Sequence, residues 1–167
     1  DNRSFITRFD NPTGNLDDWY EGCEIGEIWG LVTEGFFKDQ ADIDNHADQW
    51  DVTSYPGDRP IEPGDLKYKD LDNNGKINNG SWTVNDPGDY KVIGNNASRY
   101  NYGADFTAEW NGLDFRVLLQ GVGKKDWYPE SHYFFGIYRA PWGNVLENNL
   151  DHWTPENTDA YFPRLKS

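Results

Sequence analysis

One polar stretch of the sequence carries the residue types and the spacing of a cation-binding loop. Residues 69–82 read KDLDNNGKINNGSW, in which Asp70, Asp72 and Asn74 alternate and Gly75 follows directly. This is the beginning of an EF-hand loop, where oxygen ligands stand at every second position and a glycine permits the sharp turn. Calcium takes about six to eight oxygen ligands. The spacing therefore predicts a calcium-type site.

The pattern lacks its last ligand. The twelfth residue of an EF-hand loop should be a bidentate acid, and Ser81 stands there. Either Asp86 or Asp89, in the following NDPGD, could fold back to supply the missing carboxylate. The predicted ligand set is therefore Asp70, Asp72, Asn74, the backbone carbonyl of Lys76, Asn78, and Asp86 or Asp89.

An alternative interpretation of the same stretch needs no metal. Asp and Asn side chains accept hydrogen bonds from backbone N–H groups two residues further on, so they can hold a polar turn between two strands. No flanking helix is predicted on either side, which excludes a calcium switch that opens a helix pair. The sequence leaves both interpretations open. In the first interpretation, bound calcium would hold a long surface loop in one conformation.

The sequence gives no support to catalysis. His46, His132 and His152 lie in unrelated contexts, without an HExxH pattern or a Ser or Cys nucleophile motif. With 29 acidic residues, pairs of carboxylates are inevitable, and without a defined separation they do not indicate a glycosidase. We expect that the protein is not an enzyme.

The bulk composition restricts the classes of partner. The formal net charge of −14 repels phosphate backbones, so nucleic-acid binding is not expected. Only 36% of residues are hydrophobic, yet 8 Trp, 10 Tyr and 9 Phe argue against disorder. No apolar run reaches the roughly 18 residues of a membrane-spanning helix. The sequence has no Met, so we expect a processed chain or a piece of a larger protein.

Local signals predict a mostly extended chain with short helical turns. Residues 24–37 combine β-branched and aromatic residues with Gly, as strands and their turns do. Residues 39–50 give the best helix, with Asp39 as the N-cap. Thr154 followed by Pro155 predicts a single helical turn.

The strongest structural signal is a β-hairpin within residues 100–120. Tyr, Ala, Phe and Trp fill every even position from 100 to 110, and apolar residues continue on the odd positions from 113. Asn111 and Gly112 between them form the preferred two-residue type I′ turn. This turn pairs 110 with 113, 108 with 115, 106 with 117 and 104 with 119, so one face is apolar. On the other face Arg116 lies opposite Thr107, with Asp105 as a diagonal neighbour.

Two environments fit an apolar hairpin face. In a soluble β-sandwich it packs under a second sheet, whereas in a transmembrane barrel it faces lipid. Strands of eleven residues rise roughly 34 Å, or about 24 Å when tilted near 45°, which matches the apolar band of an outer-membrane barrel. Aromatic residues at both ends match its two girdles. The predicted membrane-facing residues are Tyr102, Phe106, Trp110, Phe115 and Val117.

Four segments resemble the late part of the SusC/RagA family of TonB-linked outer-membrane transporters. They read IGEIWGLVTEGFF, PGDLKYKDLDNNGKIN, DPGDYKVIGNNASRYNYGADFTAEWNGLDFRVLLQGVGKKDWYP and LDHWTPENTDAYFPRL. They stand in the order and with the spacing typical of that family, and together they cover most of the chain from Glu21 to Leu165. A single segment is a weak match, but the combination is specific.

The resemblance implies an all-β fold with short helical turns, which forms a segment of a 22-stranded transmembrane β-barrel with long extracellular loops. Residues 1–20 would be a strand and turn, and residues 21–95 an extracellular loop region that holds the Asp70 loop. Residues 96–120 would be the transmembrane hairpin, and residues 121–167 a second extracellular loop region that leads to a missing C-terminal barrel end.

The resemblance also implies a function and partners. The chain would be part of an outer-membrane importer of glycans or peptides that works with a SusD-type surface lipoprotein, and TonB would act on the full-length protein only. Aromatic loop residues suit contacts with substrate or lipoprotein: Trp127, Tyr128, Tyr133, Phe134 and Trp142. The alternative is a soluble calcium-dependent carbohydrate-binding or adhesion module of β-sandwich type.

Overall fold

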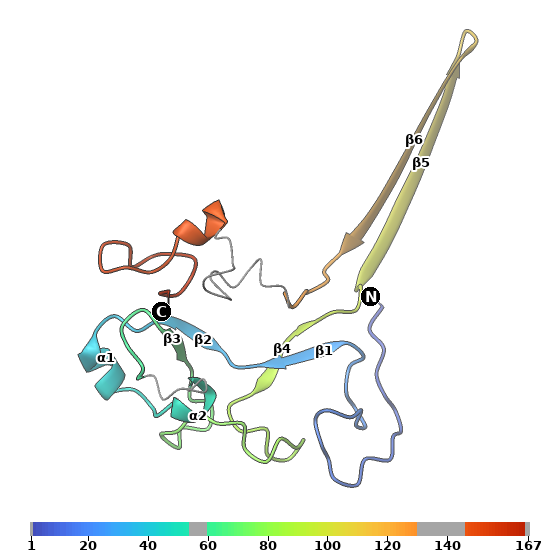
Figure 1. Cartoon of the computed structure of the whole chain (residues 1–167). Helices are drawn as coiled ribbons and strands as arrows, with labels where there is room; N and C mark the ends of the chain where they lie inside the picture. The colour runs from blue at the N-terminus through green and yellow to red at the C-terminus, as the bar shows by residue number, and fades with distance from the viewer. Residues whose placement is uncertain (1, 54–59, 130–145, 166–167) are drawn as a thin grey trace.

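The described part of the chain forms three small antiparallel sheets joined by long loops (Figure 1). The computed structural model describes residues 2–53, 60–129 and 146–165. In chain order the elements are β1 (Glu27–Gly30), β2 (Thr33–Phe36), α1 (Gln40–Asp44), α2 (Trp50–Thr53), β3 (Leu66–Tyr68), β4 (Lys91–Asn95), β5 (Tyr100–Trp110), β6 (Leu113–Gly123) and the 3-10 turn η1 (Glu147–Leu150). The predicted all-β character with short helical turns is confirmed.

The extended segment predicted over residues 24–37 forms two strands that belong to different sheets. β1 pairs with β4, and β2 pairs with β3, so the chain changes partner between Gly30 and Thr33. Both pairs contain an irregularity in register, one between Ile28 and Trp29 and one between Thr33 and Gly35. Gly35 has a φ of +132°, which a residue with a side chain rarely adopts. Both sheets are short, with strands of 3–5 residues.

The helix signals had different outcomes. The side chain of Asp39 caps α1 by accepting a 2.8 Å hydrogen bond from the N–H of Asp42, as predicted, although the helix has only five residues. The turn predicted at Pro155 is not a helix. Thr154 bridges to Asn157, whose N–H donates to the Thr154 hydroxyl at 3.1 Å. A neighbouring bridge between His152 and Phe162 folds this segment into a loop, and this tertiary pairing overrides the local helix signal.

The core of the loop region is small and partly polar. The buried apolar side chains in the described residues are Leu16, Cys23, Phe37, Ile77, Trp153 and Ala160. Gln49 is also buried, and its side chain joins two backbone groups of β3, donating to Leu66 O and accepting from Tyr68 N. His46 lies beside Phe37 with ring centroids 5.3 Å apart, and its Nε2 is 2.8 Å from Tyr68 O. The histidine therefore packs against the core, although its sequence context gives no sign of this.

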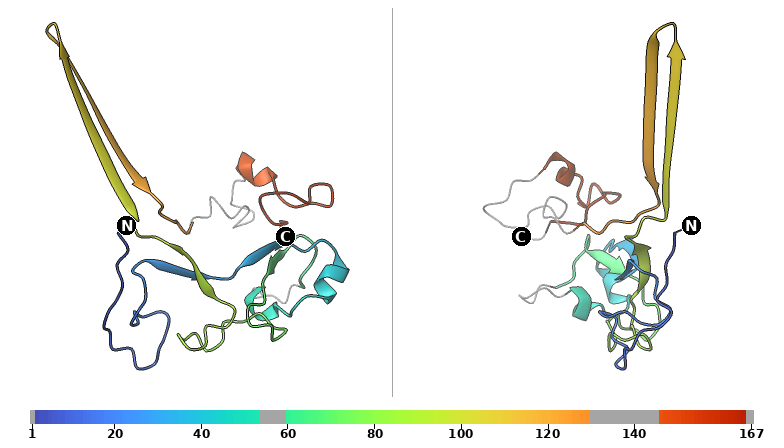
Figure 2. Two further views of the ribbon diagram at one scale, coloured as in Figure 1. Left: turned by 180° about the vertical axis from the view of Figure 1, so that it is seen from behind. Right: turned by 90° about the vertical axis from the view of Figure 1, so that its right-hand side faces the viewer.

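The β5–β6 hairpin stands away from the rest of the chain, as the views in Figures 1 and 2 agree. Its register is the predicted one, from Trp110 opposite Leu113 to Ala104 opposite Leu119. Asn111 and Gly112 have φ values of +51° and +83°, the left-handed backbone that a type I′ turn requires. No other described helix or strand contacts either strand. Among the described helices, none has the length and apolar character that crossing a membrane requires.

Candidate functional site

The Asp70 loop is folded by its own polar side chains. The Asp70 carboxylate accepts from the N–H groups of Asn73 and Gly75, at 2.7 and 2.9 Å. Asp72 accepts from the N–H of Asn74 at 3.0 Å, and Asn74 accepts from the N–H of Lys76 at 2.7 Å. Gly75 has a φ of +83°, so this position needs glycine. These successive bonds turn the chain so that its polar side chains converge.

Ile77 anchors the loop to the core. Its side chain is only 1% exposed, and its N–H donates to Asp48 O at 2.7 Å. The N–H of Asp48 in turn donates to Gly75 O at 3.0 Å. The loop is therefore fixed at its C-terminal half by backbone pairing with a segment that precedes α2.

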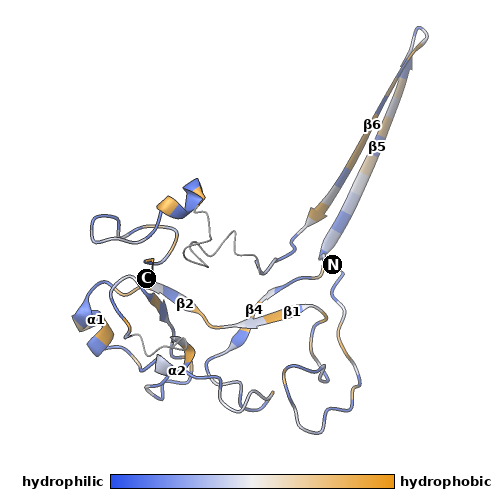
Figure 3. Ribbon diagram, viewed as in Figure 1, coloured by the Kyte–Doolittle hydropathy of each residue, from blue (hydrophilic) through white to orange (hydrophobic). Residues whose placement is uncertain are grey.

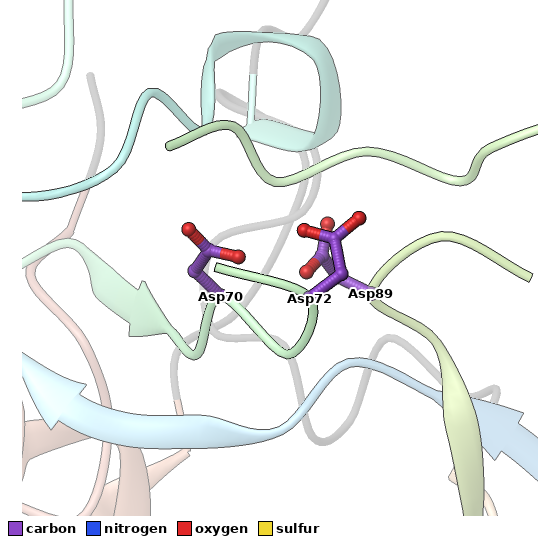
Figure 4. Close-up of side chains that lie close together, drawn as sticks. All are labelled: Asp70, Asp72 and Asp89. Carbon is purple, nitrogen blue, oxygen red and sulfur yellow. The ribbon is translucent and has the colours of Figure 1, made fainter. Parts of the chain in front are cut away.

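Asp89 returns to this loop from the NDPGD turn. Its carboxylate is fully buried and accepts hydrogen bonds from the N–H of Leu71 at 2.7 Å and the N–H of Asn78 at 2.9 Å. One carboxylate oxygen each of Asp70, Asp72 and Asp89 lie within 4.8 Å of one another. Figure 4 shows these three side chains gathered around the turn. This spacing is close enough for a shared cation.

Asp86, the other candidate for the missing carboxylate ligand, makes its hydrogen bonds outside the cluster. Its carboxylate accepts from both the N–H and the hydroxyl of Ser81, at 2.9 and 2.8 Å. Asp86 does not belong to the group formed by the three converging carboxylates. Asn78 is likewise occupied locally, because its side-chain oxygen accepts from the N–H of Gly80 at 2.7 Å. The serine at the twelfth position thus serves as the hydrogen-bonding partner of Asp86.

The hydrogen bonds favour the charged carboxylates. Desolvation opposes ionisation of Asp70, but the bonds from the Gly75 and Asn73 N–H groups outweigh it and hold the pKa of Asp70 below its ordinary value. The Ser81 hydroxyl and N–H lower the pKa of Asp86 in the same way. Both carboxylates therefore carry full negative charge at neutral pH.

The cluster fits a hard divalent cation. Three carboxylates held close together repel one another, and a cation among them removes that repulsion while using oxygen ligands, which calcium prefers. Each carboxylate oxygen retains a lone pair beyond its hydrogen bond, so the backbone bonds and a metal do not compete for the same site. The alternative interpretation, a polar turn without a metal, requires the same hydrogen bonds from backbone N–H groups to Asp and Asn side chains. The residues thus fit calcium, and the loop geometry fits both interpretations.

The hairpin displays the predicted apolar residues. The exposed fractions are 65% for Tyr102, 59% for Phe106, 75% for Trp110 and 63% for Phe115, and Val117 is half-buried between its neighbours. Figure 3 shows the apolar stretches of β6 along the free hairpin. Leu118 and Val122, which lie on the opposite face, are also more than half exposed. The second face is therefore mixed rather than wholly polar.

Two glycines shape the open end of the hairpin. Gly121 lies opposite Tyr102, and a Cβ at this position would meet the tyrosine ring at 2.2 Å. Gly123 lies opposite Tyr100, where a Cβ would be 3.3 Å from the Cβ of the tyrosine. Each tyrosine thus covers a glycine on the facing strand, which shields the bare backbone. On the other face, Arg116 pairs with Asp105, its predicted diagonal partner.

The aromatic contact residues predicted in the second loop region are described only in part. Trp127 and Tyr128 are 66% and 59% exposed. Tyr133, Phe134 and Trp142 lie outside the described residues. Both described side chains therefore expose flat apolar surface.

Comparison of the sequence with protein-family models finds no match, and comparison with curated proteins finds none. The SusC/RagA resemblance therefore rests on the segments of this sequence that carry it.

Proposed function

We propose that the chain is part of a TonB-dependent outer-membrane importer of the SusC/RagA type, which takes up glycans or peptides together with a SusD-type surface lipoprotein. The observation that carries this proposal is the β5–β6 hairpin, whose apolar face is not covered by any other described element. A contiguous apolar surface on a protein marks a place that a partner or a lipid covers.

The geometry of the hairpin supports lipid as that cover. Each strand has eleven residues, the length of a tilted strand that crosses the apolar layer of a membrane. Tyr100 and Tyr102 lie at the open end, and Trp110 lies beside the turn. Amphipathic rings at both ends suit the two water–lipid boundaries. The turn has only two residues, as expected for the periplasmic end of a barrel hairpin.

The strand edges support membership of a larger sheet. β5 and β6 pair only with each other in the described chain, so the outer edge of each strand presents unpaired N–H and C=O groups. Such groups are costly in lipid and are satisfied when neighbouring strands close a barrel. One such backbone pairing lies directly beside the hairpin, because the N–H of Asn2 donates to Arg99 O just before β5 begins.

The Asp70 loop has a structural part in this proposal. Calcium bound by Asp70, Asp72 and Asp89 would tie the segment after β3 to the segment before β4. The extracellular loop region would then keep one shape for the lipoprotein and the substrate. Exposed Trp127 and Tyr128 would contribute contact surface.

The acid cluster also favours the second candidate function, a soluble calcium-dependent carbohydrate-binding or adhesion module. A β-sandwich of that kind buries the apolar face of the hairpin under a second sheet. In the described residues, the hairpin has no such sheet over it. This difference makes the importer the better-supported function.

A matched pair of substitutions on the two hairpin faces tests the proposal. Phe106→Asp places a charge on the apolar face, and Thr107→Asp places one on the opposite face, next to Arg116. The chain is mixed with phosphatidylcholine vesicles that contain brominated lipid, and the quenching of tryptophan fluorescence is measured. The contribution of Trp110 is the difference between this quenching and that of a chain with Trp110→Phe. We expect brominated lipid to quench Trp110 in the parent chain and in Thr107→Asp. We expect this quenching to be lost in Phe106→Asp, because a charge on the lipid face costs on the order of 2 kcal/mol.

Equal quenching in the two variants would overturn the membrane assignment. The parent reading frame gives an independent check. A frame that encodes a plug and the remaining barrel strands supports the importer, and a frame hardly longer than 167 residues contradicts it.

A further inference from the structure

We propose that Asn111, in the turn of the β5–β6 hairpin, is a site of spontaneous deamidation, where a neutral amide is converted into a carboxylate. The inference does not depend on the proposed function. Asn111 and Gly112 are both exposed and form the turn at the free end of the hairpin (Figure 1). Glycine after asparagine favours this reaction, because it has no Cβ to hinder attack by its backbone nitrogen.

The reaction requires only these two residues and water. The backbone nitrogen of Gly112 loses its proton to a base in the solvent and attacks Cγ of the Asn111 side chain. The new N–Cγ bond closes a succinimide ring, and the Cγ–Nδ2 bond breaks as the amide nitrogen takes up a proton and leaves as ammonia. Water then opens the ring at either carbonyl, which gives an aspartyl or an isoaspartyl residue at position 111. Nothing is oxidised or reduced.

The sequence contains the Asn-Gly dipeptide three times, and the fold treats the three copies differently. In the Asp70 loop, the side-chain amide of Asn74 donates to Asp72 at 2.8 Å, and its oxygen accepts from the N–H of Lys76 at 2.7 Å. The N–H of Gly75 donates to the Asp70 carboxylate at 2.9 Å. Both reacting groups of this first copy are therefore held by hydrogen bonds that the attack would have to break.

The second copy, Asn79–Gly80, is restrained at its glycine. The N–H of Gly80 donates to the side-chain oxygen of Asn78 at 2.7 Å. A Cβ at Gly80 would lie 2.5 Å from a carboxylate oxygen of Asp86 and 2.7 Å from the nitrogen of Gly88, so the backbone is closely packed at this point. Rotation of the peptide toward the Asn79 side chain must therefore displace these neighbours.

The third copy, Asn111–Gly112, has neither restraint. Within the described residues, no hydrogen bond engages the Asn111 side chain or the N–H of Gly112. A Cβ at Gly112 would meet nothing within 4 Å. A base in the solvent therefore has access to the nitrogen, and the amide side chain is free to rotate toward it.

The turn geometry also suits the ring that forms. Asn111 has a φ of +51°, close to the value of about +60° that its position takes in both type I′ and type II′ turns. The two turns differ by a flip of the central peptide, and both connect paired strands. In an L-residue a succinimide ring fixes ψ at about −120°, which is the type II′ value. The ring can therefore close by that flip alone, while Trp110 stays opposite Leu113.

The product changes both the charge and the length of the turn. The new carboxylate lies near Glu109 and Asp114, which already face each other across the two strands. Like charges opposite each other destabilise a strand pair. The isoaspartyl form also adds a carbon atom to the main chain of the turn, and turn length fixes the register of a hairpin. Deamidation thus weakens strand pairing at the tip.

Mass spectrometric peptide mapping compares the three dipeptides within one sample of the full chain. The folded chain is incubated near neutral pH, and conversion of each asparagine is followed by the mass gained when the amide becomes an acid. Isoaspartyl groups are counted by methylation with protein isoaspartyl methyltransferase. We expect conversion at Asn111 to be at least roughly ten-fold faster than at Asn74 or Asn79, because the hydrogen bonds that must open at those positions give about that factor.

A sample unfolded in urea separates the effect of the fold from that of local sequence. The three rates should converge in urea, because the restraints on Asn74 and Asn79 are then lost. If Asn111 keeps its full lead in urea, its neighbours rather than the fold are the cause, and the inference is overturned. Conversion at Asn74 or Asn79 that is as fast as at Asn111 in the folded chain overturns it as well.

The variant Asn111→Gln is the matched control. It keeps a neutral amide at the turn but needs a larger ring for the same attack, which closes far more slowly. Anion exchange should resolve a more acidic form of the incubated parent chain, and this form should be absent from the variant. An equal amount of the acidic form in the variant would place the modification at another residue.

Discussion

The carboxylate of Asp89 accepts a 2.7 Å hydrogen bond from the backbone N–H of Leu71, eighteen positions earlier in the sequence. A second bond, from the N–H of Asn78, occupies its other oxygen. The fully buried side chain thus closes the Asp70 loop from behind and also brings a third negative charge beside Asp70 and Asp72. Folding of the loop and assembly of the acid cluster depend on the same residue.

Substitution of Asp89 should therefore destabilise the chain without any metal present. Asp89→Ala removes the hydrogen-bond acceptor of the part-buried N–H groups of Leu71 and Asn78. An unpaired donor that is fully buried costs about 1–3 kcal/mol. We expect a loss of roughly 2–4 kcal/mol in the free energy of unfolding, measured by urea titration with a chelator present. Asp86→Ala is the control, because its partner Ser81 is exposed and can bond water instead. An equal loss in the two variants would refute the role of Asp89.

Calcium should bind to the parent chain and raise its stability. Calorimetric titration should give heat with the parent and with Asp86→Asn, and none with Asp70→Ala, since Asp86 lies outside the cluster. Magnesium should bind more weakly, because it demands a more regular geometry than the loop provides. If the parent gives no more heat than Asp70→Ala, the loop is a polar turn held by its own hydrogen bonds.

Acid should weaken the loop region at a pH set by two aspartates. The pKa values of Asp70 and Asp86 are lower in the folded chain than in the unfolded one. The unfolded chain therefore takes up protons first as the pH falls. The stability that the two charged carboxylates contribute is fully present above the ordinary aspartate pKa of about 3.9, and it is lost as the pH falls through the lowered pKa values. Urea midpoints measured from neutral pH downward should drop in that range. Asp70→Asn/Asp86→Asn should give a flatter profile, and an unchanged slope would contradict the assignment.

Gly64 and Gly22 form a matched pair for testing the contact between the C-terminal segment and the loop region. Their φ values are +89° and +92°, so alanine brings similar backbone strain, about 1–2 kcal/mol, at either position. At Gly64 the added Cβ would also lie 2.3 Å from a ring atom of Trp153, whereas at Gly22 nothing lies within 4 Å. We expect Gly64→Ala to cost about 1–3 kcal/mol more than Gly22→Ala in urea unfolding. Equal costs would show that the Trp153 ring is not held against Gly64.

The features that the sequence predicts well are those fixed by near neighbours. Alternation with a period of two and the Asn111–Gly112 turn determine the hairpin register, and Asp39 caps α1 because its partner is three residues away. Both signals are complete within a short window, so no distant contact is needed to read them.

The choice between Asp86 and Asp89 could not be made from the sequence. Both flank the same Pro87–Gly88 turn, and the outcome depends on which side chain Ser81 captures and which one becomes buried. The approach of Asn2 to Arg99 and of Arg99 to Lys124 was also beyond prediction, because it depends on tertiary backbone pairing. The positions of Gln49 and His46 against β3 have the same cause.

The two-residue turn of the hairpin also sets an order of events during folding. All pairs of β5 and β6 are local in sequence, whereas β1 must find β4, and β2 must find β3, across long intervening segments. Hairpins close in about 1–10 μs, and pairing over long separations is slower. The apolar face of the hairpin is thus complete while the acidic region is still unfolded. A newly made chain therefore exposes this apolar surface first, and productive folding depends on how soon the surface is covered compared with its rate of self-association.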